Sequence, residues 1–131
     1  MKSLEPTGVS RVLIVEDNRD TADTTAMLLR MHGFDVAVAY DGKTALRTAK
    51  GYDPDVVLLD LSLPDIDGYA VAESLRKEGL DRASFIAVSG HAPDEEAWAN
   101  TCFSDHLVKP VGKDALVSLL ARVQVEKSCS R

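Results

Sequence analysis

Short runs of hydrophobic residues recur along the chain, and several are continuous rather than alternating. They cover residues 12–15, 36–39, 56–59, 85–88 and 107–108. The first, third and fourth runs contain many β-branched residues, which is typical of strands covered on both faces. The run at 107–108 is too short to predict a strand by itself, and we include it because it completes a regular alternation of strands and helices.

Helical patterns fill the intervals between these runs. For the first three, the candidate amino-terminal caps are Asn18, Asp41 and Asp67, and the candidate stops are Gly33, Gly51 and Gly79. A weaker helical pattern covers about 93–100. The last helix has one apolar face with spacing i, i+3, i+4 and i+7, formed by Leu116, Leu119, Leu120 and Val123.

The order of elements is therefore strand then helix, repeated five times. Such alternation predicts an α/β fold in which helices cover both faces of a parallel sheet. Five strands favour the flavodoxin-like, doubly wound (βα)5 fold with strand order 2-1-3-4-5. We predict one domain over 11–125, with tails at 1–10 and 126–131.

Composition narrows the classes of function for these 131 residues. Fifteen Lys and Arg against 21 Asp and Glu give a net charge of −6, which argues against direct nucleic-acid binding. No apolar run approaches the roughly 18 residues that a membrane span needs, and residues 1–10 lack the apolar core of a secretory signal. Cys102 and Cys129 fit neither a disulfide framework nor a zinc site. We therefore expect a cytoplasmic domain without membrane contact.

Polar side chains follow four of the predicted strands: Glu16 and Asp17, then Asp60, then Ser89, then Lys109. Parallel strands end at one edge of the sheet, so these groups should meet there. Oxygen ligands without His or Cys favour Mg²⁺, and a lysine suits a phosphate. The set predicts an aspartate that accepts a phosphoryl group. Singly, each residue has a plainer explanation as a turn, cap or surface residue, but four strand ends with compatible chemistry favour the site.

Four stretches together carry a family resemblance. They are VLIVEDN at 12–18, VLLDLSLPDIDG at 57–68, VSG at 88–90 and KPV at 109–111. With them the chain resembles the CheY-like receiver domain of two-component response regulators from about residue 11 to residue 125. Each stretch is weak evidence alone, whereas the combination is highly specific.

The resemblance implies a phosphoacceptor and a set of metal ligands. Asp60 would take the phosphoryl group from a histidine kinase or a histidine phosphotransfer protein. Asp17 would bind Mg²⁺ directly, Glu16 would act through metal-bound water, and Asp60 and the backbone carbonyl of Ser62 would complete the protein ligands.

The resemblance also implies a switch rather than a conventional enzyme. Lys109 would contact the phosphoryl oxygens, and Ser89 would move in to bond them. That movement would rearrange the surface of the fourth helix, fifth strand and fifth helix, where an unidentified effector or output domain would read it. The peptide bond between Lys109 and Pro110 would be cis, as is typical of such domains.

Two residues near the predicted output face are open to two interpretations. His106 occupies the position, three residues before the lysine, where the family often has Tyr or Phe. It is either a pH-sensitive switch residue or a half-exposed surface histidine. Trp98 lies on the predicted fourth helix and is either part of the output face or ordinary half-buried packing.

Several alternatives stay open from the sequence. The stretch 105–111 resembles receivers attached to hybrid sensor kinases, which pass their phosphate onward, and many receivers form homodimers through the fourth and fifth helices.

A phosphohydrolase resembling the haloacid dehalogenase family would need a second Asp where this chain has Ser62. A flavodoxin-like nucleotide-binding module would need a glycine-containing loop where the chain has acidic residues at 16–20. A degenerate, phosphate-independent receiver is the third alternative.

Overall fold

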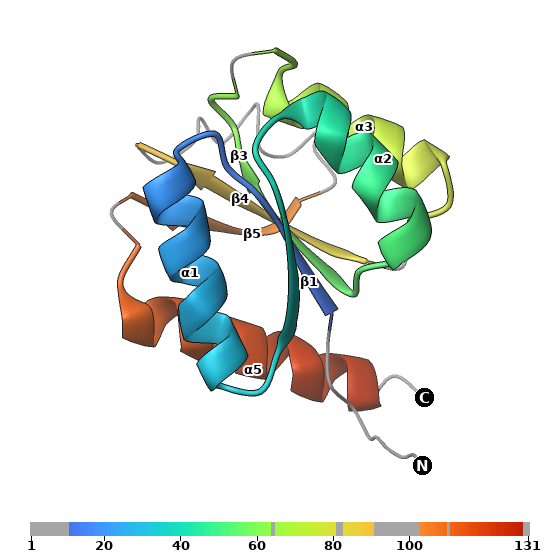
Figure 1. Cartoon of the computed structure of the whole chain (residues 1–131). Coiled ribbons are helices and arrows are strands. Elements are labelled where there is room, and N and C mark those ends of the chain that lie inside the picture. The colour runs from blue at the N-terminus through green and yellow to red at the C-terminus, as the bar shows by residue number, and fades with distance from the viewer. Residues whose placement is uncertain (1–10, 64, 81–82, 91–102, 110, 130–131) are drawn as a thin grey trace.

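A five-stranded parallel sheet forms the centre of the molecule (Figure 1). The computed structural model describes residues 11–63, 65–80, 83–90, 103–109 and 111–129. The strands are β1 (Arg11–Val15), β2 (Asp35–Ala39), β3 (Val56–Asp60), β4 (Ser84–Ser89) and β5 (Phe103–Val108). Their order is β2-β1-β3-β4-β5, and every neighbouring pair is parallel. The predicted fold class and strand order are confirmed.

The described helices cover both faces of the sheet, with α1 and α5 on one face and α2 and α3 on the other (Figure 1). They are α1 (Arg19–Met31), α2 (Gly42–Tyr52), α3 (Gly68–Lys77) and α5 (Lys113–Cys129). Within the described ranges, no helix is long and apolar enough to cross a membrane. The helix expected near 93–100, which includes Trp98, lies outside the described residues.

Two predicted boundaries differ from the structure. The helix α5 continues to Cys129, past the point at 126 where we expected a tail. The helix α2 passes through Gly51 and ends at Tyr52, and its cap, Asp53, adopts the left-handed conformation with φ 53°. Aspartate tolerates this conformation better than most residues, so it can end a helix where glycine was expected.

The helix starts follow the predicted capping chemistry. Side chains of Asn18, Asp41 and Asp67 accept hydrogen bonds from backbone N–H groups in the first turns of α1, α2 and α3. Gly33 and Gly79, both with positive φ, follow the ends of α1 and α3 as predicted. Local sequence therefore sets where these three helices begin.

Alternating residues of each central strand belong to two separate hydrophobic cores. In β1, Val12 and Ile14 pack with α1 and α5, whereas Leu13 and Val15 pack with α2 and α3. All four are at most 3% exposed. Burial on both faces explains why the central strands are continuous hydrophobic runs in the sequence.

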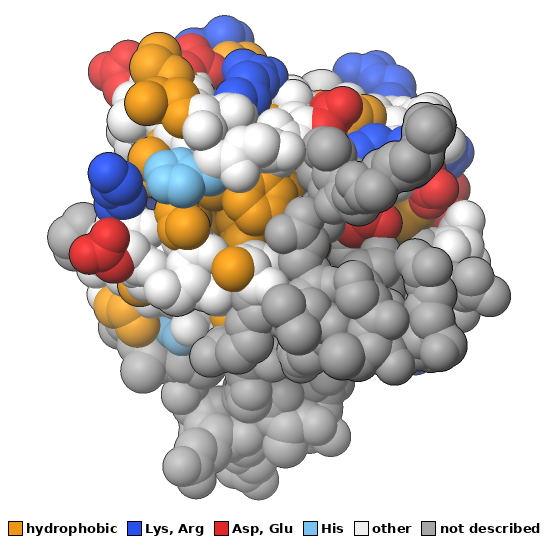
Figure 2. Space-filling view, turned by 90° about the horizontal axis from the view of Figure 1, so that it is seen from below, with side chains coloured by type: hydrophobic (Ala, Val, Ile, Leu, Met, Phe, Trp, Pro, Cys, Tyr) orange, Lys and Arg blue, Asp and Glu red, His pale blue; other side chains and the backbone are white. Residues whose placement is uncertain are grey.

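Figure 2 shows the molecule from below relative to Figure 1, and on its described part acidic, basic and hydrophobic side chains are interspersed. The acidic groups that carry the predicted chemistry instead follow the carboxyl ends of β1 and β3.

Gly68 allows the start of α3 to pack against the chain that follows β3. A Cβ atom added at Gly68 would lie 2.8 Å from the Cα of Leu61 and 2.9 Å from the backbone oxygen of Asp60. Both neighbours are backbone atoms, which cannot move away without shifting the strand end. The glycine therefore fixes how closely α3 approaches Asp60.

We expect Gly68→Ala to lower the free energy of unfolding by about 1–3 kcal/mol, because the added methyl group overpacks this contact. Urea unfolding followed by circular dichroism measures the change. The control is Gly51→Ala, since a Cβ there meets nothing within 4 Å and the position is helical. This control should raise the stability by about 0.5–1 kcal/mol. Equal effects of the two substitutions would contradict the packing argument.

Candidate functional site

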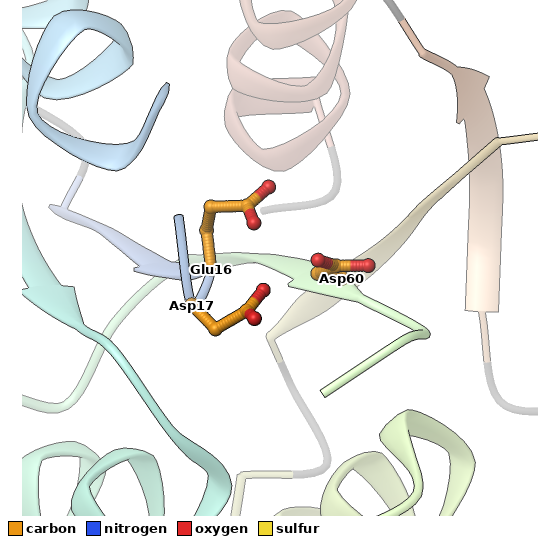
Figure 3. A group of neighbouring side chains, drawn as sticks. All are labelled: Glu16, Asp17 and Asp60. Atoms are coloured by element: carbon orange, nitrogen blue, oxygen red, sulfur yellow. The ribbon is translucent and has the colours of Figure 1, made fainter. Parts of the chain in front are cut away.

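Three carboxylates converge at the carboxyl edge of the sheet. Glu16 and Asp17 follow β1, and Asp60 is the last residue of β3. One oxygen from each lies within 4.8 Å of the others, and Figure 3 shows the side chains of Glu16 and Asp17 extending toward Asp60. The parallel register of Val15 with Leu59 brings the two strand ends to the same level. The predicted meeting of these residues is confirmed.

Lys109 neutralises part of this negative charge. Its Nζ lies 3.0 Å from Oε1 of Glu16 and 3.0 Å from Oδ2 of Asp60. The backbone N–H of Lys109 donates to the carbonyl of Ser89 at 2.7 Å, which extends the β4–β5 pairing to the site. Three carboxylates and one ammonium leave two negative charges uncompensated when all are ionised. A hard divalent cation with oxygen ligands fits this donor set.

Burial and hydrogen bonds shift the pKa values of two site residues. Burial raises the pKa of Glu16 above its ordinary value, and the bonds from Lys109 and the Asn18 N–H only partly offset it. For Lys109, burial acts to lower the pKa, but hydrogen bonds to Glu16 and Asp60 outweigh burial and raise it. Hydrogen bonds thus favour the charged form of Lys109, whereas burial disfavours the charged form of Glu16.

The Asp60 carboxylate is held at both oxygens. Oδ1 accepts from the backbone N–H of Ser62 at 2.9 Å, and Oδ2 accepts from Lys109. The residue is 2% exposed. A carboxylate fixed in this way would need little reorganisation to act as a nucleophile. The contact observed for Ser62 uses its N–H, and the expected role of its carbonyl as a metal ligand stays a prediction.

Ser89 and His106 contact each other on neighbouring strands. Ser89 Oγ and His106 Nε2 are 2.8 Å apart, and Ser89 is 6% exposed. The register of β4 with β5 sets His106 opposite Ala87, two residues before Ser89. Residues two apart share a face of a sheet, so the strand alignment was the signal that could have revealed this contact.

One further residue near the site was missed by the sequence reasoning. The carboxylate of Asp65 accepts hydrogen bonds from the backbone N–H groups of Gly42 and Lys43, at 2.9 and 3.1 Å. The Gly42 bond is the main cause that lowers the pKa of Asp65. This contact ties the loop after Asp60 to the start of α2. The Lys109–Pro110 peptide bond, expected to be cis, involves Pro110, which lies outside the described residues.

A cavity of about 710 Å³ adjoins the carboxylates on the side of α1 and α5. Its lining includes Glu16, Asp60 and Lys109 together with apolar side chains such as Leu28 and Leu116. The charged side chains of the site therefore lie beside a cavity whose lining is mainly apolar.

Comparisons with known proteins agree with this geometry. The response regulator receiver domain family matches residues 12–121. The transcriptional regulatory protein PrrA of Mycobacterium tuberculosis is 37% identical over 121 residues, which are 90% of this chain and 51% of PrrA. The cell cycle response regulator CtrA of Brucella abortus is 34% identical over 110 residues, which are 82% of this chain and 47% of CtrA. The chain thus spans about half the length of these relatives.

Solved structures show the same similarity. A CheY-like receiver domain protein from Methanospirillum hungatei has a TM-score of 0.87 and 25% identity, covering 94% of this chain and 99% of its own. A CheY-like receiver domain from Methylobacillus flagellatus has a TM-score of 0.78 and 32% identity, covering 88% and 98%. From the family match, the shared strand order and the acidic site at the strand ends, the chain belongs to the response regulator receiver domains of two-component signalling.

Proposed function

We propose that Asp60 is the phosphoacceptor of this receiver domain and that phosphorylation requires Mg²⁺. The observation that carries the proposal is the contact of Lys109 Nζ with Asp60 Oδ2 inside the three-carboxylate group. Receiver domains are signalling phosphoacceptors rather than conventional enzymes, they interact with histidine kinases, and the family typically uses Mg²⁺. The three carboxylates and Lys109 fit a phosphoacceptor that uses a divalent cation.

In the proposed reaction, a carboxylate oxygen of Asp60 attacks the phosphorus atom of a phosphohistidine. A P–O bond forms while the P–N bond breaks, and the electron pair of that bond remains on the departing imidazole nitrogen. When bound, Mg²⁺ supplies positive charge against the phosphoryl oxygens. Asp17 and Asp60 would hold it directly, Glu16 would act through water, and the Ser62 carbonyl would be a further ligand.

After transfer, Lys109 and Ser89 would bond the phosphoryl oxygens. The ammonium of Lys109 already contacts the accepting carboxylate, so it lies beside the group that forms there. Ser89 ends β4, the strand next to β3, and its carbonyl accepts the Lys109 N–H. Movement of Ser89 would therefore pull on the start of the segment after β4 and on β5. We propose that a partner reads the resulting surface of the fourth helix, β5 and α5.

The proposed donor is a histidine kinase or a histidine phosphotransfer protein. The proposed place of action is the cytoplasm, where such kinases draw on ATP. PrrA is a transcriptional regulatory protein of about twice this length. We therefore expect a separate output domain or effector to recognise the phosphorylated surface. Any contact with nucleic acid would be made by that partner and not by this domain. Two further predictions concern the assembly of the domain. One is attachment to a hybrid sensor kinase, and the other is a homodimer formed through the fourth and fifth helices.

We expect Mg²⁺ to bind the native chain and Asp17→Asn to weaken binding by about tenfold or more, because a directly coordinating carboxylate is lost. Isothermal titration calorimetry measures the affinity. The matched control is Asp20→Asn, which removes an exposed charge in the first turn of α1 outside the three-carboxylate group. Solvent screens that charge, so the control should bind Mg²⁺ almost as the native chain does. Equal losses in both variants would contradict direct coordination.

The Mg²⁺ affinity should also depend on pH through Glu16. Because burial raises the pKa of this carboxyl above its ordinary 4.5, its proton competes with the cation in the range just above that value. Affinity should therefore increase as the pH rises through this range and then level off. Glu16→Gln should reduce the slope of affinity against pH. A slope unchanged in the variant would show that Glu16 does not take part.

Phosphorylation itself is tested by incubating the chain with acetyl phosphate and measuring the intact mass. We expect the native chain to gain one phosphoryl group with Mg²⁺ and none without it, and Asp60→Asn to gain none. The control Asp67→Asn keeps a good helix cap on the same loop and should gain the group normally. No gain by the native chain would favour a degenerate receiver, whereas turnover of a generic phosphate ester would favour the phosphohydrolase.

A further inference from the structure

The hydroxyl of Ser89 has a definite partner in the structure, the imidazole of His106. Ser89 Oγ and His106 Nε2 are 2.8 Å apart. The two residues come from adjacent parallel strands, and the register sets His106 beside Ala87 on the face of the sheet that Ser89 shares. This contact joins the end of β4 to β5.

A serine hydroxyl has one hydrogen to donate. When His106 carries its hydrogen on Nδ1, Nε2 is an acceptor and the Ser89 hydroxyl donates to it. A phosphoryl oxygen is also an acceptor, and it needs the same hydrogen. The imidazole and the phosphoryl group are therefore competitors for one donor.

We propose that His106 is a positioning residue that accepts the Ser89 hydrogen in the unphosphorylated domain and so opposes the phosphorylated state. The inference rests on the proposed function, because the competing acceptor is the phosphoryl group on Asp60. Phosphorylation transfers the Ser89 hydrogen bond from the imidazole to the phosphoryl oxygen. The imidazole loses this one bond at the same time.

The position of β5 brings this change in hydrogen bonding near the surface. In the described sheet β5 is an edge strand, and Val108, two residues after His106, is 45% exposed. His106 itself is half-buried. The contact between Ser89 and His106 therefore changes close to an exposed part of β5, which a partner can reach.

The test measures binding of beryllofluoride, a stable mimic of the phosphoryl group, by calorimetry with Mg²⁺ present. His106→Phe keeps an aromatic ring and removes the acceptor, so beryllofluoride should bind about 3- to 10-fold more tightly, the range expected for one hydrogen bond that no longer has to be broken. His106→Gln retains an acceptor near the Nε2 position and should bind much as the native chain does.

The decisive comparison repeats His106→Phe in a chain that carries Ser89→Ala. If His106 acts through the Ser89 hydroxyl, the phenylalanine should then have almost no effect on beryllofluoride binding. An equal effect with and without the hydroxyl would overturn the proposal, as would native-like binding by the single His106→Phe variant.

Failure of the proposed function has a different signature. If the native chain does not bind beryllofluoride with Mg²⁺, the phosphoacceptor assignment fails and the competition fails with it. If the native chain binds and Asp60→Asn does not, the phosphoacceptor assignment holds, and the His106 and Ser89 variants alone decide whether the imidazole competes. A nitrogen-15 spectrum that locates the imidazole hydrogen on Nε2 in the unphosphorylated chain would also overturn the competition.

Discussion

The contact of Lys109 with both Glu16 and Asp60 is the interaction on which the candidate site depends. Two carboxylates that are at most 6% exposed lie near each other, and burying such charges without a cation carries a large free-energy cost. The ammonium meets both at 3.0 Å. It lowers the repulsion enough for the strands to end side by side, and it still leaves negative charge for a divalent ion.

The packed sheet fixes the positions of the strand ends that carry this ion-paired site. Both faces of β1 and β3 are packed into separate cores, so neither strand can slip without moving many buried side chains. The loop after β3 is fixed by contacts of its own. Gly68 lets α3 lie against the backbone of Asp60, and Asp65 binds the start of α2. The loop after β3 is thus held from two directions.

The fold and the gathering of the acidic site could be predicted because both follow from local signals. Continuous apolar runs identified the strands, and parallel strands must end at one edge. Contacts that depend on tertiary alignment could not be predicted in the same way. The bond between Ser89 and His106 needs the β4–β5 register, which shifts between Phe85 and Ile86. The end of α2 at Tyr52 was missed because Gly51 is the stronger local stop signal, whereas the left-handed residue that caps the helix is Asp53.

The central place of β3 in the strand order divides the tasks of the domain between two sides. On one side of β3 lies β1, which is followed by two members of the three-carboxylate group, Glu16 and Asp17. On the other side lie β4 and β5, which carry Ser89 and His106. In the proposed function, the residues that would complete the cation site lie on the β1 side of Asp60, and the residues that would respond to the phosphoryl group lie on the β4–β5 side. The two sets meet where Lys109 contacts Glu16 and Asp60. Substitutions along β5 should therefore change the response to the phosphoryl group more than the binding of the cation.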